Sequence, residues 1–365
     1  MDKELEKLRA DIDSIDAELQ RLLNERAACA QRVAEVKTQA AAGGDEGEPV
    51  FYRPEREAQV LRKVMQRNSG PLEAKTVAHI FREIMSACLA LEKPISVAYL
   101  GPQGTFTEAA ALKHFGNAAL REPKNNISDI FAAVQRRECQ YGVLPVENST
   151  EGMVTHTIDN FIASPLKICG ELELPIALHL LVQPDADPAQ LEKICAHQQA
   201  LAQSRNWLQQ HFPGVEIEAV SSNGEAARIA ASNAQVAAVA GEMAAERYGL
   251  VHVASDIQDY ADNTTRFLVI ANQEVPASGH DKTSLVVSTR NEPGALYHLL
   301  ASLKREGISL TRIETRPSRT ENWAYVFFME FHGHHQEASV QRVIDDFVKR
   351  AIMVKVLGSY PAAVI

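Results

Sequence analysis

The chain has 365 residues, enough for two or three domains with complete cores, and its composition is that of an ordinary soluble protein. The formal net charge is -10 and no run of lysine and arginine occurs, which argues against nucleic acid or an anionic membrane as a partner. The opening residues, Met1 to Glu4, lack the apolar stretch of a signal peptide, so we expect a cytoplasmic location. The scattered cysteines argue against a disulfide framework and a zinc site.

A long amphipathic helix is predicted at the start of the chain. Apolar residues recur in steps of three and four from Leu5 to Val36, and the one charged residue within this stripe is Arg26. A guanidinium on a buried helix face is costly unless an anion meets it there. Arg26 therefore marks either a register-setting polar residue in a helical bundle or an anion-binding site.

Two further cations flank the same helix face. Arg26 and Lys37 lie ~16 Å apart along a helix, so their long side chains can converge on one small ligand. Arg9 lies ~25 Å before Arg26, and it joins a compact site most easily from a second, antiparallel chain. Shorter helices are predicted near residues 54–68 and 72–92, and three helices with one very long member favour a dimer.

Glu92 ends the third predicted helix. It follows Phe81, Met85 and Cys88 along the apolar face, so we expect its carboxyl group to face inward. The alternative is a frayed helix end that exposes it.

Strands alternate with helices from Pro94 to about residue 272, which predicts an α/β region. The strand candidates are 95–100, 141–146, 176–182, 215–220, 236–240 and 267–271. The last segment is predicted to be a βαββαβ module. Its strands are expected at 283–289, 308–315, 323–331 and 353–357, with one helix at 294–306 and another that carries Val340, Val343 and Phe347 on one face. Such a module more often pairs and binds a ligand than catalyses a reaction.

Four polar loops follow predicted strands, where open α/β sheets place their ligand crevice. They span residues 101–107, 145–152, 221–224 and 262–267. Any one of them can be turn chemistry alone, but four together predict a binding site. None is a phosphate loop, and no Ser-His-Asp order is present. His332, His334 and His335 are interpreted as a solvated hairpin rather than a metal site.

The motifs carry a family resemblance. Over essentially its whole length, the chain resembles the bifunctional chorismate mutases/prephenate dehydratases of phenylalanine biosynthesis, which end in an ACT regulatory domain. The matching segments are Leu8-Arg9, Asn24 to Arg26, Lys37, Pro54 to Glu57, Asn263 to Phe267, Gly294 to Leu296 and Glu314 to Pro317. The resemblance implies a multidomain fold: an all-α helical mutase dimer domain (1–93), an α/β two-lobed, periplasmic-binding-protein-like dehydratase domain (94–273) and an α+β ACT domain (282–360).

The resemblance also implies a mutase site. The rearrangement of chorismate to prephenate is pericyclic and needs no nucleophile, so catalysis must come from holding the reactive conformer and stabilising charge on the ether oxygen. Lys37 and Glu92 are implied as catalytic contacts to that oxygen. The implied chorismate-binding residues are Arg9, Arg26, Lys37, Arg53, Arg56, Glu57, Cys88 and Glu92. Relatives often carry Asp at the position of Arg53, and some carry Ser at that of Cys88.

In the dehydratase domain, prephenate loses carbon dioxide and hydroxide, and a hydroxyl donor must assist the poor leaving group. The resemblance assigns this role to Thr265. The implied prephenate-binding residues are Thr105, Glu147, Asn148, Gln203, Thr265 and Arg266. The implied phenylalanine site comprises Asn291, Gly294, Ala295, Leu296, Glu314, Thr315, Arg316 and Pro317. No metal or cofactor is implied, and a homodimer or higher homo-oligomer is expected.

Two other classes of protein compete with this interpretation. One is a non-catalytic amino-acid sensor, and the other is a helical dimerisation protein with degenerate sites. The joint presence of Arg9, Arg26, Lys37, Glu57 and Thr265 argues against both.

Overall fold

The computed structural model describes residues 2–42, 50–290, 292–317 and 325–365. It divides into two compact units. The first comprises residues up to Arg53, Val60–Ile95 and Phe115–Leu120, and the second comprises Pro54–Gln59, Ser96–His114 and Arg121–Ile365. Among the described residues, no helix is both long and apolar enough to span a membrane.

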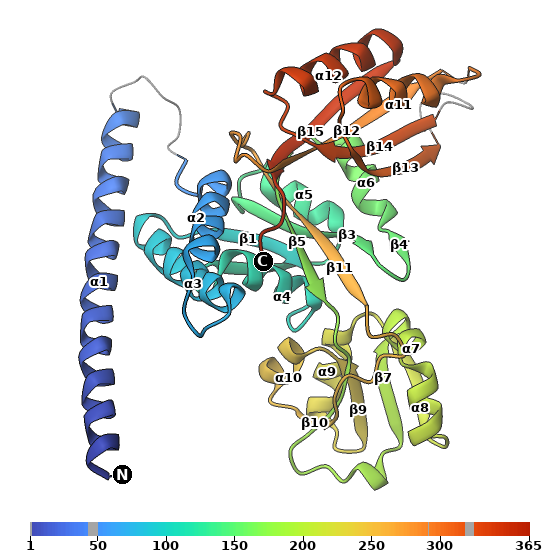
Figure 1. Cartoon of the computed structure of the whole chain (residues 1–365). Helices are drawn as coiled ribbons and strands as arrows, with labels where there is room; N and C mark the ends of the chain where they lie inside the picture. Colours follow the sequence, from blue (N-terminus) through green and yellow to red (C-terminus); the bar gives the residue numbers. More distant parts are fainter. Residues whose placement is uncertain (1, 43–49, 291, 318–324) are drawn as a thin grey trace. The chain divides into compact units, whose positions relative to one another are not determined.

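Three helices precede the first strand in the described part of the chain (Figure 1). They are α1 (Asp2–Ala42), α2 (Pro54–Arg67) and α3 (Ala74–Glu92), as predicted. Helix α1 packs against α3, yet its apolar stripe is exposed in the single chain. The exposed residues include Leu5, Leu8, Ile12, Ile15, Leu19, Leu22, Leu23, Val33 and Val36. An exposed apolar stripe of this length is typical of an interaction surface.

Two mixed sheets follow in the second unit. The first has the strand order β2-β1-β3-β11-β5, with β4 paired to β3, and the second has the order β10-β6-β9-β7-β8. The strands are β1 (Ser96–Leu100), β2 (Leu120–Lys124), β3 (Tyr141–Asn148), β4 (Gly152–Met153), β5 (Lys167–Pro175), β6 (His179–Val182), β7 (Lys193–His197), β8 (Glu216–Val220), β9 (Val236–Ala240), β10 (Val251–Ala254) and β11 (Thr264–Ala271). The chain enters the second sheet after β5 and returns along β11, so the region has two lobes (Figure 1).

Helices connect these strands. They are α4 (Phe106–Phe115), α5 (Ile127–Gln135), α6 (Thr155–Ala163), α7 (Gln198–Gln203), α8 (Arg205–His211), α9 (Asn223–Ser232) and α10 (Glu242–Tyr248), with a short 3-10 turn, η1 (Pro188–Gln190). All six predicted strands of this region are present, although β6 begins at His179 rather than at Ile176. The strands that were not predicted are β2, β4, β5, β7 and β10.

The C-terminal module has the predicted βαββαβ order. Its elements are β12 (Asp281–Thr289), α11 (Ala295–Arg305), β13 (Leu310–Pro317), β14 (Tyr325–His332), α12 (Ala338–Arg350) and β15 (Met353–Pro361), and its sheet order is β13-β14-β12-β15. Helices α11 and α12 cover one face of this sheet (Figure 1). Val286, Phe328 and Tyr360 on the other face belong to the apolar core of the first lobe, so the module packs directly against that lobe.

Candidate functional sites

In the helical unit, Lys37 of α1 lies beside Glu92 of α3. The distance from Lys37 Nζ to Glu92 Oε2 is 3.8 Å, and the two side chains are 27% and 11% exposed. Lys37 Nζ also donates to the carbonyl oxygen of Phe51 at 3.3 Å. Glu92 therefore faces inward, as predicted, and the frayed-end alternative is wrong.

The carboxyl group of Glu92 has a raised pKa. Burial raises the pKa of Glu92 above its usual value, and the positive charges of Lys37 and Arg26 offset that rise only in part. Within the described residues, Glu92 Oε2 is buried without a hydrogen-bond partner. The structure thus brings together Arg26, Lys37 and Glu92, which are two cations and a carboxyl group whose pKa is raised.

The other residues implied for chorismate binding differ in their exposure to solvent. Arg9 is exposed on α1, far along the helix from Arg26. Arg53 and Arg56 are exposed, Glu57 is half-buried on α2, and Cys88 is buried on α3. A single chain therefore does not bring Arg9 to the Arg26 end of the helix.

In the two-lobed region, five polar side chains form one connected cluster. Asn148 Nδ2 donates to Thr265 Oγ1 and to Asn263 Oδ1, both at 2.9 Å. Asn263 Nδ2 donates to Gln203 Oε1 at 2.9 Å, and Gln203 Nε2 donates to Thr150 Oγ1 at 3.0 Å. Because the oxygen of Thr265 accepts from Asn148, its hydroxyl proton is available to a ligand.

This cluster draws on both lobes. Asn148 ends β3 and Thr265 lies near the start of β11, whereas Gln203 ends α7 beside the second sheet. Three residues predicted for prephenate are therefore brought together. Asn263 and Thr150 were not predicted individually, although each lies in one of the polar loops that the sequence identifies.

Thr105 stands apart from these contacts. Its Oγ1 donates to the carbonyl oxygen of Leu100 at 2.9 Å and accepts from the backbone N–H of Glu108 at 3.4 Å. These bonds hold the start of α4, and among the described contacts none joins Thr105 to the Thr265 cluster.

Glu147 and Arg266 point away from the Thr265 cluster. Thr265 pairs with Asn148 across β11 and β3, and Arg266 pairs with Glu147. Consecutive residues of a strand face opposite sides of the sheet, so the second pair lies behind the first. Glu147 forms an ion pair with Arg312 of β13. The structure therefore gives both predicted prephenate residues partners in the C-terminal module.

Arg266 lies in a buried ion cluster. Its Nε donates to Glu171 Oε2 at 2.8 Å, and its Nη2 pairs with Glu330 of β14. Lys282 Nζ lies 2.8 Å from Glu171 Oε1, and the Tyr360 hydroxyl donates to Glu330 at 2.9 Å. Burial opposes ionisation of Glu330, but the charges of Arg266 and Lys282 outweigh it and hold its pKa at about 2.

The predicted effector residues surround the start of α11 and the end of β13. Gly294 has φ +85° and directly precedes α11, a conformation that favours glycine. Leu296 packs against the core of the C-terminal module, and Thr315 pairs with Phe327 of that core. Arg316 lies 3.2 Å from Asp159 of α6. Asn291 and the side chain of Pro317 lie outside the described residues.

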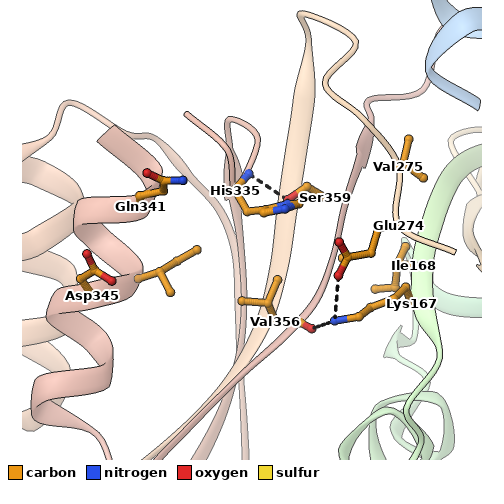
Figure 2. Close-up of a pocket in the computed structure, with 11 residues that line it drawn as sticks. Lys167, Ile168, Glu274, Val275, His335, Gln341, Asp345, Val356 and Ser359 are labelled. Atoms are coloured by element: carbon orange, nitrogen blue, oxygen red, sulfur yellow. Dashed lines mark hydrogen bonds and ion pairs between the residues drawn. The ribbon is translucent and has the colours of Figure 1, made fainter. Parts of the chain in front are cut away.

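The solvated-hairpin interpretation is wrong for His334. This side chain is fully buried, and its ring Nε2 lies 2.8 Å from the carbonyl oxygen of Val275. The described residues contain no group of three potential metal ligands. His335 accompanies Ser359 in a cavity of about 380 Å³ between β5, α12 and β15 (Figure 2). No residue predicted for a site lines this cavity.

Comparisons with known proteins find two family models along the chain. The family model "Chorismate mutase type II" matches residues 8–93, and "Prephenate dehydratase" matches residues 97–275. A bifunctional chorismate mutase/prephenate dehydratase of Pseudomonas aeruginosa is 54% identical over 99% of both chains, and one of Aquifex aeolicus is 44% identical over 100% of this chain and 99% of its own.

A solved structure extends the likeness to the fold. The prephenate dehydratase of Arthrobacter aurescens, crystallised in complex with L-Phe, is 32% identical, with a TM-score of 0.68 over 73% of this chain and 90% of its own. The chain belongs to the family of bifunctional chorismate mutases/prephenate dehydratases and has both enzymatic domains.

Proposed function

We propose that residues 1–93 rearrange chorismate to prephenate, that residues 94–273 convert prephenate to phenylpyruvate, and that residues 282–360 form an ACT domain through which phenylalanine inhibits the enzyme. The meeting of Lys37 with Glu92 supports the first assignment. The Thr265 cluster supports the second, because it places a hydroxyl donor among amides from both lobes.

The mutase site is proposed to be shared by two chains. The exposed stripe of α1, which runs from Leu5 to Val36, needs an apolar partner, and a second copy of α1 supplies one. Antiparallel pairing of two such helices carries Arg9 of the partner subunit toward Arg26. The two guanidinium groups then bind the carboxylates of chorismate, while Lys37 and protonated Glu92 donate to the ether oxygen as its bond breaks.

Complementation tests this shared site. Arg9→Ala and Arg26→Ala protein should each have little mutase activity. A mixture that exchanges subunits should regain up to about a quarter of the wild-type sites, because half of the dimers are hybrid and one of their two sites escapes both changes. Prephenate formation is measured before and after mixing, with exchange verified by tagged chains. Exchange without recovery would show that each site is built from one chain.

At the dehydratase site, Thr265 is proposed as the proton donor. As the ring carboxylate leaves as carbon dioxide, the electrons of its bond aromatise the ring and expel the ring hydroxyl group. The Thr265 hydroxyl donates its proton to that leaving oxygen, which departs as water, and Thr265 Oγ1 then regains a proton from solvent. Asn148 fixes the donor, since its amide occupies an acceptor position on Thr265 Oγ1. Gln203 orients the substrate from the facing lobe, and Asn263, which directly precedes β11, connects Gln203 to Asn148.

Phenylalanine is proposed to bind where α11 begins, beside Glu314 and Thr315 of β13. The backbone N–H of Ala295 donates to the carbonyl oxygen of Glu292, and the N–H groups that follow it in the first turn of α11 suit the carboxylate of phenylalanine. The L-Phe complex of the Arthrobacter aurescens enzyme supports this ligand. Asn291, Gly294, Ala295, Leu296, Arg316 and Pro317 complete the proposed site.

Thr315→Trp should weaken the inhibition by phenylalanine strongly, because an indole on the α11 side of β13 fills the space of the effector. We expect the concentration for half-inhibition of the dehydratase to rise at least about tenfold, the scale of a lost well-packed contact. Mutase activity of the same sample serves as the folding control. Inhibition at the wild-type concentration would place the effector elsewhere. A point substitution is preferable to truncation, because Val286 and Phe328 complete the core of the first lobe.

A cytoplasmic location is proposed from the thiols. All five cysteines are free and four of them are buried, the state that a reducing compartment maintains.

A further inference from the structure

Two charged residues lie on the face of β3 and β11 that is opposite to the dehydratase site. Glu147 directly precedes Asn148 in the chain, and Arg266 directly follows Thr265. Glu147 and Arg266 are cross-strand partners of each other. The polar pair and the charged pair thus lie on opposite faces of the same two strands. Each charged residue is joined to a polar residue of the site by one peptide unit. A shift of the backbone at Glu147 or Arg266 therefore also moves Asn148 or Thr265.

The C-terminal module holds both members of the charged pair. Arg312 of β13 pairs with Glu147, and Glu330 of β14 pairs with Arg266. The two contacts differ in environment. The side chains of Arg266 and Glu330 are 5% and 1% exposed, whereas those of Arg312 and Glu147 are 26% and 24% exposed. Breaking the buried Arg266–Glu330 ion pair therefore costs more free energy than breaking the partly exposed Arg312–Glu147 ion pair.

The more exposed ion pair, Arg312 with Glu147, involves strand β13, which also carries the predicted phenylalanine-binding residues Glu314 to Pro317. Arg312, Glu314 and Arg316 alternate along β13 and therefore share a face. Arg316 pairs with Asp159 of α6, so this face of β13 is directed at the first lobe. A shift of β13 must change the Arg312 contact, because that ion pair is the one described charged contact between β13 and the end of β3.

We propose that Arg312 is a positioning residue of the dehydratase: through Glu147 it fixes the end of β3, and so the Asn148 amide that holds Thr265. This inference rests on the proposed role of Thr265. According to this proposal, Glu147 lies on the opposite face of β3 from the substrate and does not contact prephenate. The C-terminal module affects dehydratase turnover through β13.

Arg312→Gln in the full-length enzyme tests the proposal. Without effector, kcat of the dehydratase should fall about tenfold with KM within about twofold, because misplacement of a catalytic group costs rate rather than substrate binding. Glu147→Gln should have the same effect, and the double variant should lose no more than either single variant. Arg312→Lys should recover most of the rate, since an ammonium can still pair with Glu147.

The matched control is Asp159→Asn. It removes an ion pair of the same kind between β13 and the first lobe, but one without a link to Asn148, and it should leave kcat unchanged. Mutase activity and the melting temperature report folding. A KM effect in Glu147→Gln would show that Glu147 binds prephenate, and additive losses or wild-type kcat in Arg312→Gln would also overturn the proposal. Retained activity in Thr265→Ala would instead refute the proposed function on which it rests.

Discussion

Thr265→Ala is expected to lower dehydratase kcat by at least about a hundredfold, the usual contribution of a positioned general acid. The methyl group of alanine cannot donate to the leaving hydroxyl, and the Asn148 amide loses its acceptor at 2.9 Å. Chorismate conversion to prephenate should stay within about twofold of wild type, because Lys37 and Glu92 belong to the other compact unit. Both products are measured on the same sample.

Two variants make this result specific. Thr265→Ser keeps the hydroxyl group and should retain much of the activity. Thr264→Ala removes the same atoms one residue earlier, on the opposite face of β11, and should have little effect. Equal losses in Thr264→Ala and Thr265→Ala, or a parallel loss of mutase activity, would point to damage of the strand rather than to a lost proton donor.

Part of the Thr265 cluster could be predicted from the sequence, because polar loops that follow predicted strands can be recognised there. Asn148 lies in a polar loop that follows a predicted strand. Gln203 lies in none of the predicted loops, and β7 before it was not predicted, so only the family resemblance indicates Gln203. Asn263 is equally central, since it bridges Asn148 and Gln203, yet nothing in its local pattern separates it from a turn asparagine. Its role depends on which two side chains lie beside it in the folded chain.

Glu147 and Arg266 show where sequence reasoning stops. Each lies beside a site residue in the chain, but strand alternation turns it to the opposite face, and its partners come from the C-terminal module. Strand β5 was missed for the same reason. Glu171 interrupts its apolar pattern, and a buried carboxylate becomes acceptable only when Arg266 and Lys282 meet it.

The mutase should be most active in acid and lose turnover as pH rises through the pKa of Glu92. A carboxyl group donates a hydrogen bond only when protonated, whereas a carboxylate would repel the negative charge that develops on the ether oxygen. Since burial raises the pKa of Glu92 above its usual value, the protonated form persists to higher pH than in an exposed glutamate. The activity is present below that pKa and is lost above it.

Glu92→Gln should remove this dependence, because an amide donates at every pH. If the donor acts as an oxyanion-hole donor does, its loss is worth roughly 3 kcal/mol, about a hundredfold in rate between the acid and alkaline limits. Glu73→Gln, an exposed carboxylate at the other end of α3, is the matched control and should leave the profile unchanged. The measurement is mutase kcat from pH 5 to pH 9, with dehydratase kcat recorded in parallel. Identical profiles for wild type and Glu92→Gln would mean that Glu92 does not donate to the ether oxygen, and Lys37 would then have to stabilise that charge without it.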